Sequence, residues 1–353
     1  MKFPRKRTLA YIAIGLLLFV AVSVWGGIQF VKSRFFAETP NRLSIVGDAA
    51  SVPFEWATNR HEDYFEQHGA ILLPVTVPGI EKQLYVQLDT GAPSSFLRSG
   101  CMESLAERGL EFELYTDDKT TRVKHFELDV GDSRVALDGG WVMKREIFID
   151  WEEPYNVIGS LGADFIDGRV CAIDFPAKQL HLRKERTEEF NSLGKYETFR
   201  FPGRRILLPA QIQGKDCELL YDSGCSPFGL ITSKYHFDRY ADENTEALQL
   251  DLNAFGNGIP IHHQACSLEV SFGEAAVPIK RVSYVDKYSG MQSLFGGFID
   301  GGFMGNKFLL ESTLILDVKA KEFLLVQGSI ESSADELAAS EKDDGDPAAK
   351  SPE

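Results

Sequence analysis

Two short motifs in this chain place a carboxylate beside a hydroxyl and a glycine. They are Asp89-Thr90-Gly91 and Asp222-Ser223-Gly224. Two carboxylates held about 3 Å apart cannot both ionise, so they share one proton. One of them can then act as general base on a water lying between them, while the other donates a proton to the substrate. This chemistry uses neither a cofactor nor a metal ion, and we expect neither.

The residues that follow each aspartate have roles of their own in such an arrangement. Gly91 and Gly224 allow two backbones to approach closely and tolerate unusual torsions. The hydroxyls of Thr90 and Ser223 can form hydrogen bonds to the opposite loop and hold the pair together. The two aspartates are therefore the candidate catalytic residues, and these four residues are expected to support the loops that carry them.

An internal repeat brings the two motifs to corresponding positions in the chain. The recurring pairs, in chain order, are Ile71-Leu72-Leu73-Pro74 with Ile206-Leu207-Leu208-Pro209, the two Asp motifs, Leu161-Gly162-Ala163-Asp164-Phe165-Ile166 with Met304-Gly305-Asn306-Lys307-Phe308-Leu309, Asp174 with Asp317, and Ala177-Lys178-Gln179-Leu180 with Ala320-Lys321-Glu322-Phe323. Landmarks that recur in the same order predict two related lobes, residues 69–195 and 196–328. A pseudo-twofold axis between the lobes would bring the two Asp turns face to face.

The elements that must position these turns are predicted to be strands. Apolar stretches in the body are short, often alternate with polar residues, and are bounded by Gly, Pro and Asp. The clearest predicted strands are Leu84–Leu88, Phe126–Val130, Leu268–Phe272 and Phe323–Val326. Short helices are expected near Ser99–Arg108 and Gly162–Ile166. The fold class is therefore predicted to be mainly β.

Composition excludes some classes of function. The 353 residues carry a formal net charge of −15, which argues against nucleic acid as a partner because phosphates require clustered Lys and Arg. Residues 329–353 are acidic and poor in large apolar side chains, so they are predicted to be a disordered tail. The five cysteines match no zinc-binding pattern, and a fold of this size requires no disulfide.

The N-terminus is predicted to anchor the protein in a membrane. Basic residues precede an apolar run from Leu9 to Val31, which is long enough to cross a bilayer as a helix. The basic flank favours a cytoplasmic N-terminus, which places the body outside the cytoplasm, in the periplasm of a Gram-negative cell. A cleaved signal peptide with a site at Ala21-Val22-Ser23 is the alternative. We expect residues 1–35 to form the basic stub and anchor, and 36–68 a linker with little regular structure.

The two Asp motifs, in their wider context, resemble those of a known family. Leu88-Asp89-Thr90-Gly91-Ala92 and Tyr221-Asp222-Ser223-Gly224-Cys225 are similar to the active-site motifs of aspartic peptidases. Leu161-Gly162 and Met304-Gly305 resemble the apolar-apolar-Gly element that supports each Asp loop in that family. The short lobes are more similar to two fused retropepsin-type units than to pepsin, and membrane-anchored bacterial proteins of the retropepsin-like type are the most similar class. The resemblance covers most of residues 69–328.

The resemblance implies both a fold and an activity. The fold would be a closed, mainly β barrel structure of two lobes with a long cleft, complete in a single chain. The activity would be that of an aspartic endopeptidase that hydrolyses a polypeptide substrate of the cell envelope. The alternative is a catalytically silent peptide-binding module or envelope scaffold that has kept this fold.

The sequence departs from the pepsin pattern after each glycine of the two motifs. Pepsin-type enzymes carry Ser or Thr there, whereas this chain has Ala92 and Cys225. Losing a hydroxyl removes a hydrogen bond to the ionised carboxylate, which raises the pKa values of the pair. We therefore expect a pH optimum nearer neutrality than that of a gastric enzyme.

The resemblance also implies a hairpin flap over the cleft. By position it should lie at Leu114–Lys124, with Tyr115 as its tyrosine, or at the equivalent segment Phe255-Gly256-Asn257-Gly258 in the second lobe. Residues 36–68 could in addition cover the cleft as a propeptide, a hypothesis that rests on their position in the chain.

Several other residues of reactive types are expected to have structural roles. His262-His263 point to opposite faces of a strand and make a poor chelating pair. Cys225 has no identifiable His partner and is expected to be a small buried residue. Ser226 lacks the Gly-x-Ser-x-Gly context of a serine hydrolase. Asp174 and Asp317 each precede a strand and are expected to form turns.

Overall fold

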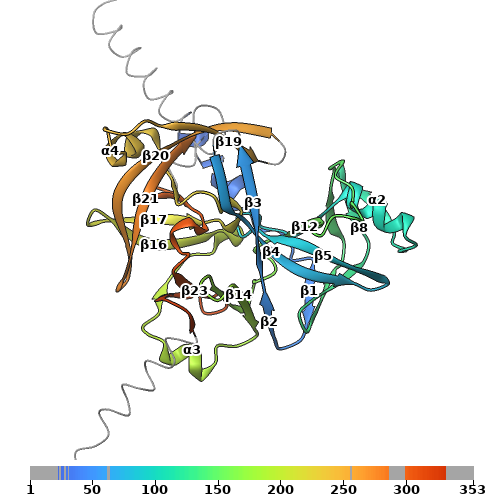
Figure 1. Ribbon diagram of the computed structural model, residues 1–353. Coiled ribbons are helices and arrows are strands. Elements are labelled where there is room, and N and C mark those ends of the chain that lie inside the picture. Colours follow the sequence, from blue (N-terminus) through green and yellow to red (C-terminus); the bar gives the residue numbers. More distant parts are fainter. Residues whose placement is uncertain are drawn as a thin grey trace, which may run out of the picture.

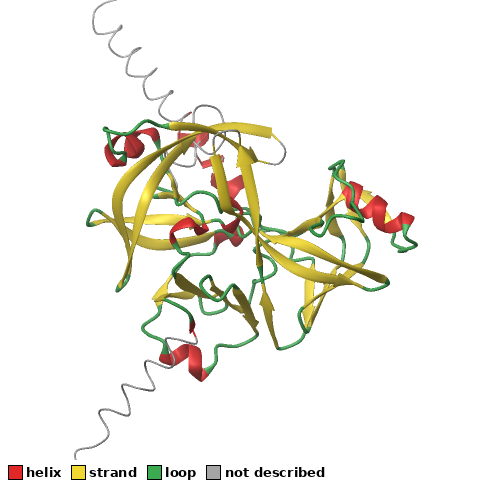
Figure 2. Ribbon diagram, in the orientation of Figure 1, coloured by secondary structure: helices red, strands yellow, loops and turns green. Residues whose placement is uncertain are grey.

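The computed structural model of this protein describes residues 23, 25–27, 29–30, 32–61, 64–254, 257–285 and 299–330. Strands dominate, and several are long and strongly curved, so that the sheets curl into a half-barrel (Figures 1 and 2). The helices α2 (Ser99–Glu107), α3 (Glu188–Ser192) and α4 (Lys234–Tyr240) lie at the outer edges of the sheets. The prediction of a mainly β protein is confirmed.

The first half of the chain supplies an eleven-stranded sheet. In spatial order its strands are β1 (Leu43–Val46), β10 (Ser133–Leu137), β9 (Phe126–Val130), β4 (Tyr64–Val77), β5 (Ile80–Leu88), β12 (Val157–Leu161), β6 (Phe96–Arg98), β11 (Gly140–Met143), β8 (Thr120–Val123) and β7 (Leu114–Asp117), with β3 (Glu55–His61) paired to β4. β12 lies between β5 and β6, parallel to the first and antiparallel to the second. The first Asp motif follows β5 and is thereby held next to the end of β12.

The second half builds the same arrangement in a seven-stranded sheet. Its strands, in spatial order, are β16 (Ile206–Ile212), β17 (Lys215–Tyr221), β22 (Gly302–Met304), β18 (Leu230–Ile231), β21 (Ala275–Val285), β20 (Asn257–Phe272) and β19 (Leu248–Ala254). β22 lies between β17 and β18, parallel to the first and antiparallel to the second. The internal repeat in the sequence is therefore also a repeat in strand topology.

A six-stranded sheet joins the two halves. Its strands, in spatial order, are β15 (Glu197–Thr198), β24 (Glu322–Gln327), β23 (Ser312–Asp317), β13 (Val170–Asp174), β14 (Gln179–Arg183) and β2 (Ala49–Pro53). β13 and β23 are equivalent strands of the repeat, and they pair antiparallel with Ala172 opposite Ile315. Since these two residues are themselves repeat equivalents, a local twofold axis passes between them.

The turns that follow β13 and β23 are alike. Asp174 accepts a hydrogen bond from the backbone N–H of Ala177 at 2.9 Å, and Asp317 accepts one from Ala320 at 2.8 Å. Aspartate side chains commonly stabilise turns in this way. The turn role predicted for both aspartates is confirmed.

The predicted strands are present, and one of them shows why the Asp loop is rigid. Residues 84–88 at the end of β5 are almost continuously buried, whereas the start of the strand alternates between half-buried and exposed positions. Continuous burial is typical of a strand that pairs on both sides and is covered on both faces. The first Asp motif therefore leaves the sheet from its most tightly packed part.

Of the two predicted helices, one is present. Residues 99–107 form α2, but residues 163–168 form a series of turns. The chain has only a few residues here in which to pass from β12 to β13, and the Asp164 carboxylate is bound by the N–H and hydroxyl of Ser95. The equivalent segment of the second half is the 3-10 turn Asn306–Phe308.

The expectation that residues 36–68 lack regular structure is wrong. β1, β2 and β3 occupy residues 43–61, and β4 begins at Tyr64. Edge strands this short leave little periodicity in the sequence, yet Val52 and Phe54 belong to the buried core. Because these strands belong to two of the sheets, the segment is part of the folded body, which contradicts the hypothesis of a removable 36–68 propeptide.

Most of the predicted anchor, and the acidic tail from residue 331, lie outside the described residues. Within the described part of the chain, no helix is both long and apolar enough to span a bilayer.

Candidate active site

Both aspartates are fixed through their backbones by the repeated apolar-apolar-Gly element. The N–H of Asp89 donates to the carbonyl oxygen of Leu161, and the N–H of Asp222 donates to that of Met304, each at 2.9 Å. Leu161 ends β12 and Met304 ends β22, the strands that lie beside the two Asp loops. The supporting role expected of these elements is present in both halves.

The glycines of the same elements leave room for the turns that follow the Asp motifs. A Cβ atom on Gly162 would lie 2.7 Å from the carbonyl oxygen of Ala92, and one on Gly305 would lie 2.1 Å from that of Cys225. Neither contact is tolerable between a carbon and a backbone oxygen. Any larger residue would push the Asp loop away from its support.

The carboxyl group of each aspartate faces the glycine of the opposite loop. A Cβ on Gly91 would lie 2.2 Å from Asp222 Cγ. A Cβ on Gly224 would lie 2.6 Å from Asp89 Oδ1 and 3.0 Å from Asp222 Oδ1. The two carboxylate oxygens are therefore closer together than the sum of these two distances, which is within reach of one water bound to both. The structure brings together the two predicted catalytic residues.

Thr90 and Ser223 link the loops reciprocally. The N–H of Thr90 donates to Ser223 Oγ and the N–H of Ser223 donates to Thr90 Oγ1, each at 2.9 Å. The Ser223 hydroxyl donates onward to the Leu88 carbonyl oxygen at 2.9 Å, and the Thr90 hydroxyl to that of Tyr221 at 3.4 Å. Both side chains are fully buried. The cross-loop hydrogen bonds expected of these hydroxyls are present.

Electrostatics make the carboxyl of Asp89 a proton carrier near neutral pH. Its burial, and then the negative charge of Asp222, raise the pKa of Asp89 to about 7. The backbone N–H of Ala92 and the cation of Arg205 oppose this shift and lower the pKa. Raised pKa values were expected from missing hydroxyls, but burial and the second carboxylate are the causes for Asp89.

Arg205 lies beside the two carboxyl groups and was not singled out in the sequence. Its Nη1 donates to the carbonyl oxygen of Gly91, and its guanidinium lies 4.6 Å from the centre of the Phe35 ring. Burial lowers the pKa of Arg205, and the charges of Asp222 and Asp89 raise it. Its Nε is buried and has no hydrogen-bond partner among the described residues. Arg205 is thus a half-buried cation beside the two aspartates.

Only a mismatch between the two repeats could have drawn attention to this residue. Arg204 and Arg205 stand directly before the second Ile-Leu-Leu-Pro landmark, where the first copy has Gly69 and Ala70. Two arginines at a position where the first repeat has small uncharged residues, in an acidic chain, are a weak signal of a special role.

Cys225 differs from the small apolar residue that we expected. Its Sγ donates to Asp222 Oδ2 at 3.2 Å. Burial, followed by the charge of Asp222, raises the pKa of the Cys225 thiol well above its ordinary value. The thiol therefore stays protonated and replaces the expected hydroxyl as a weaker donor, which makes it unsuited to act as a nucleophile. On the other loop, the N–H of Ala92 donates to Asp89 Oδ1 at 3.1 Å.

The two aspartates lie in a cleft of about 800 Å³. Most of the residues that line the cleft come from the first half of the chain. The second half contributes only a few of them, including Arg205, Cys225 and Phe303. A cleft of this size suits a peptide or a drug-sized ligand.

The hairpin β7–β8 covers part of this cleft, as expected for the segment Leu114–Lys124. Its turn residues Asp118 and Lys119 both have positive φ, at 42° and 64°, which is the geometry of a tight hairpin. Thr120 and Arg122 line the cleft, whereas Tyr115 is 38% exposed and lies near Gly139. Tyr115, the candidate tyrosine of this flap, is not among the residues that line the cleft. In the alternative flap, Phe255 and Gly256 lie outside the described residues.

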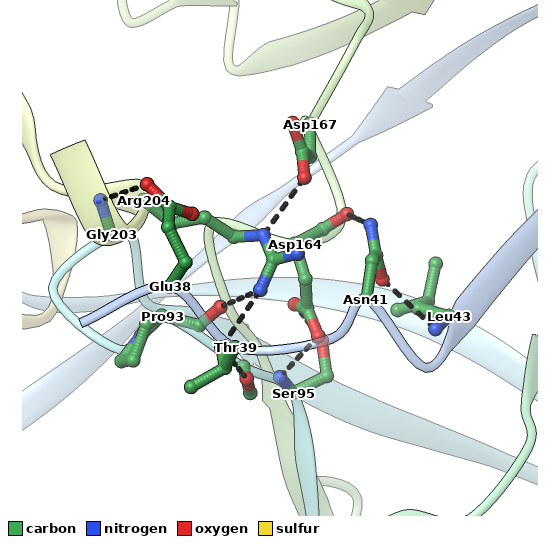
Figure 3. Close-up of polar contacts among 11 residues, drawn as sticks. Glu38, Thr39, Asn41, Leu43, Pro93, Ser95, Asp164, Asp167, Gly203 and Arg204 are labelled. Atoms are coloured by element: carbon green, nitrogen blue, oxygen red, sulfur yellow. Dashed lines mark hydrogen bonds and ion pairs between the residues drawn. The ribbon is translucent and has the colours of Figure 1, made fainter. Parts of the chain in front are cut away.

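The chain before β1 forms hydrogen bonds with residues at the start of the second half (Figure 3). Glu38 accepts a hydrogen bond from the N–H of Gly203 at 3.0 Å, and Arg204 Nη1 donates to Thr39 Oγ1 at 3.0 Å. Arg204 also pairs with Asp167 at 2.8 Å. Thr39 and Pro40 of this segment line the cleft. The segment therefore contributes to the wall of the site.

The remaining candidates have structural positions. His263 is buried and bonded to Ser283 Oγ at 2.7 Å, and His262 stacks on the ring of Tyr284. Ser226 Oγ accepts a hydrogen bond from Asn306 Nδ2 at 3.0 Å.

Comparison with known proteins adds no family assignment. No protein-family model matches the chain, and no curated protein sequence matches it.

Proposed function

We propose that this protein is an aspartic-type endopeptidase with a two-lobed, retropepsin-like fold, in which Asp89 and Asp222 activate a water molecule. The observation that carries the proposal is the symmetric pair of Asp loops, in which each carboxyl group faces the glycine of the other loop. The reciprocal hydrogen bonds of Thr90 and Ser223 support it, since they fix the separation of the two carboxyl groups.

The proposed mechanism follows from the shared proton. Because burial and the charge of Asp222 raise the pKa of Asp89 to about 7, Asp89 carries the shared proton below that pH. Asp222 then accepts a proton from the bound water, which attacks the carbonyl carbon of the scissile peptide bond. Asp89 donates its proton to the carbonyl oxygen, giving a neutral gem-diol. Proton transfer to the nitrogen and collapse of the gem-diol release the two products.

We also propose that the protein is anchored in a membrane and acts on a substrate of the cell envelope. The apolar run from Leu9 to Val31 supports a membrane anchor with the body outside the cytoplasm. A protein held there would act on polypeptides of the cell envelope, and the cleft beside the dyad has room for an extended segment of such a chain.

Peptide hydrolysis by the full-length chain tests the proposal. A peptide library is incubated with the wild type, Asp89→Asn, Asp222→Asn and the control Asp132→Asn, whose side chain is exposed and lies outside the cleft. We expect cleavage by the wild type and the control, and loss of at least a thousandfold in the rate for both dyad variants. Cleavage that persists in either dyad variant contradicts the mechanism. A folded wild type that binds peptides without cleaving them between pH 3 and 8 would instead be a peptide-binding module.

A further inference from the structure

The cleft has a charge opposite to that of the whole molecule. The chain carries a formal net charge of −15, yet five arginines line the cleft. They are Arg42, Arg98, Arg122, Arg145 and Arg205. The acidic residues of the same lining are the two aspartates of the dyad, which share a proton, and Asp164, which is hydrogen-bonded to Ser95. The wall is therefore cationic.

Three of these arginines lie on or beside one face of the part of the eleven-stranded sheet that β6, β11 and β8 form. Side chains two residues apart on a strand point to the same face. Phe96 and Arg98 on β6, Thr120 and Arg122 on β8, and Trp141 and Met143 on β11 all line the cleft and follow this spacing, which Arg145 continues beyond the end of β11. The face that β6, β8 and β11 present to the cleft is called here the arginine wall.

The register of the strands orders the side chains of the arginine wall. Trp141 is opposite both Phe96 and Arg122, and Met143 is opposite Arg98. The rings of Phe96 and Trp141 are 5.5 Å apart. An apolar strip thus runs along the wall, with Arg122 at one side and Arg98 and Arg145 towards the other end.

The cations at that end are not paired with a carboxylate of the described residues. Among the residues that the structure describes, Arg98 and Arg145 form no ion pair with a carboxylate, whereas Arg134, Arg186 and Arg200 outside the cleft all do. Arg98 Nη1 is bound to the carbonyl oxygen of Val157. Two neighbouring, half-buried cations without an anion repel each other, so the site is ready to receive a negative charge from a ligand.

We propose that the arginine wall selects polypeptide segments in which an acidic residue lies two positions from a large apolar residue. The apolar side chain would pack on the strip of Phe96, Trp141 and Met143, and the carboxylate would bind Arg98 and Arg145. The spacing follows because side chains two apart in an extended peptide face the same wall. Arginine suits this role because its planar guanidinium can hold a carboxylate through two hydrogen bonds. This inference rests on the proposed peptidase function.

Matched peptides test the proposal on the full-length chain. A cleaved library peptide is made with Glu, Gln or Lys two positions from its apolar residue. We expect the wild type to favour Glu over Gln about tenfold in kcat/KM, mostly through KM, and to disfavour Lys. In Arg98→Gln and in Arg145→Gln the Glu to Gln ratio should fall towards one. Arg145→Glu should invert the preference between Glu and Lys, a gain that misfolding cannot produce.

The control variant is Arg134→Gln, because Arg134 is exposed, ion-paired and absent from the cleft. Its Glu to Gln ratio should remain that of the wild type. Equal cleavage of the Glu and Gln peptides by the wild type would overturn the inference while leaving the peptidase proposal intact.

Binding separates the two proposals if no peptide is cleaved. Fluorescence anisotropy with the labelled Glu and Gln peptides would then be measured for the wild type, Arg98→Gln and Arg145→Gln. Tighter binding of the Glu peptide, lost in both variants, would support the arginine wall even though the peptidase proposal had failed. Binding of the two peptides with equal affinity would overturn the inference.

Discussion

Thr90 and Ser223 exchange hydrogen bonds across the junction between the two halves of the protein. Each side-chain oxygen accepts from the backbone N–H of the other residue at 2.9 Å, and both residues are buried. The two loops are therefore joined by side chains, although they lie 133 residues apart in the sequence. This link sets the distance between the carboxyl groups of Asp89 and Asp222.

Removing either hydroxyl should destabilise the protein and impair the dyad together. Thr90→Val keeps the volume but leaves the buried N–H of Ser223 without an acceptor, and Ser223→Ala does the same to Thr90. An unsatisfied buried donor costs about 1–3 kcal/mol in the free energy of unfolding. We expect each variant to lose that amount in denaturant unfolding, with reduced kcat.

The double variant provides the control for this prediction. Since the two hydrogen-bond networks are shared, the losses in the single variants should not add in a double-mutant cycle. Additive losses would mean that the two hydroxyls stabilise their own loops and do not act as one link.

Asp89 should make the stability of the protein depend on pH. Its folded-state pKa, about 7, is above its ordinary value of 3.8, so between these values the folded state binds more protons than the unfolded state. The stability contributed by this residue is therefore lost as the pH rises from about 4 to 7. Asp89→Asn removes the buried charge and should be more stable than the wild type by about 2–4 kcal/mol at pH 8.

Unfolding experiments at two pH values check this sign. At pH 4 Asp89→Asn and the wild type should have similar stability, and the difference should appear only at higher pH. Asp132→Asn, at an exposed position, should show no such dependence. A variant that is less stable than the wild type at pH 8 would contradict the assignment of a raised pKa to Asp89.

The Asp loops could be predicted from the sequence because their determinants are local and repeated. Each motif is contiguous, follows an apolar strand, and recurs at the same place in the repeat, as do the turns at Asp174 and Asp317. The chemistry of a carboxylate pair then explains why glycines and hydroxyls accompany the aspartates. Local patterns of this kind can be recognised in the sequence without knowledge of the tertiary fold.

The rest of the site depends on contacts that no local pattern records. Arg98, Arg122 and Arg145 form one wall only through the pairing of β11 with β6 and β8. Arg205 matters because tertiary packing places it beside Gly91. Strands β1–β3 are stabilised by the sheets they join more than by their own sequence, which is why the sequence predicts a linker over residues 36–68.

Glu66 and Lys307 should form a second link between the halves. The Glu66 side chain is 2% exposed and its carboxylate pairs with Lys307 Nζ, although the residues are 241 positions apart. Lys307→Met removes the cation that pairs with this buried carboxylate and keeps the contact of Glu66 with His68. Because removing the cation beside a buried carboxylate is costly, and Lys307 is 37% exposed, we expect a loss of about 2 kcal/mol in unfolding free energy.

A double variant distinguishes the cost of burying the Glu66 carboxylate from its attraction to Lys307. Glu66→Gln with Lys307→Met should be more stable than Lys307→Met alone, since no charge is then left buried. If the double variant is the less stable of the two, the carboxylate must contribute through contacts other than this ion pair.

Arg205 should set the upper pH limit of activity. In the proposed mechanism Asp89 must hold its proton, so the alkaline limb of the pH–rate profile should report its pKa of about 7. The cation of Arg205 lowers this pKa, and removing the cation should therefore raise it. We expect Arg205→Gln to move the alkaline limb upward by up to about one pH unit, with a smaller shift in Arg205→Lys, which keeps the charge.

The profile of kcat/KM against pH distinguishes this electrostatic role from a structural one. The guanidinium also binds the Gly91 carbonyl oxygen and lies over Phe35, so the variant loses packing as well as charge. Loss of packing alone would lower the rate at every pH without moving the alkaline limb. Arg205→Lys should recover the position of the limb more fully than the absolute rate, since an ammonium keeps the charge but loses the planar donor geometry. A limb that stays at the wild-type pH in Arg205→Gln would show that Arg205 does not contribute to the pKa of Asp89.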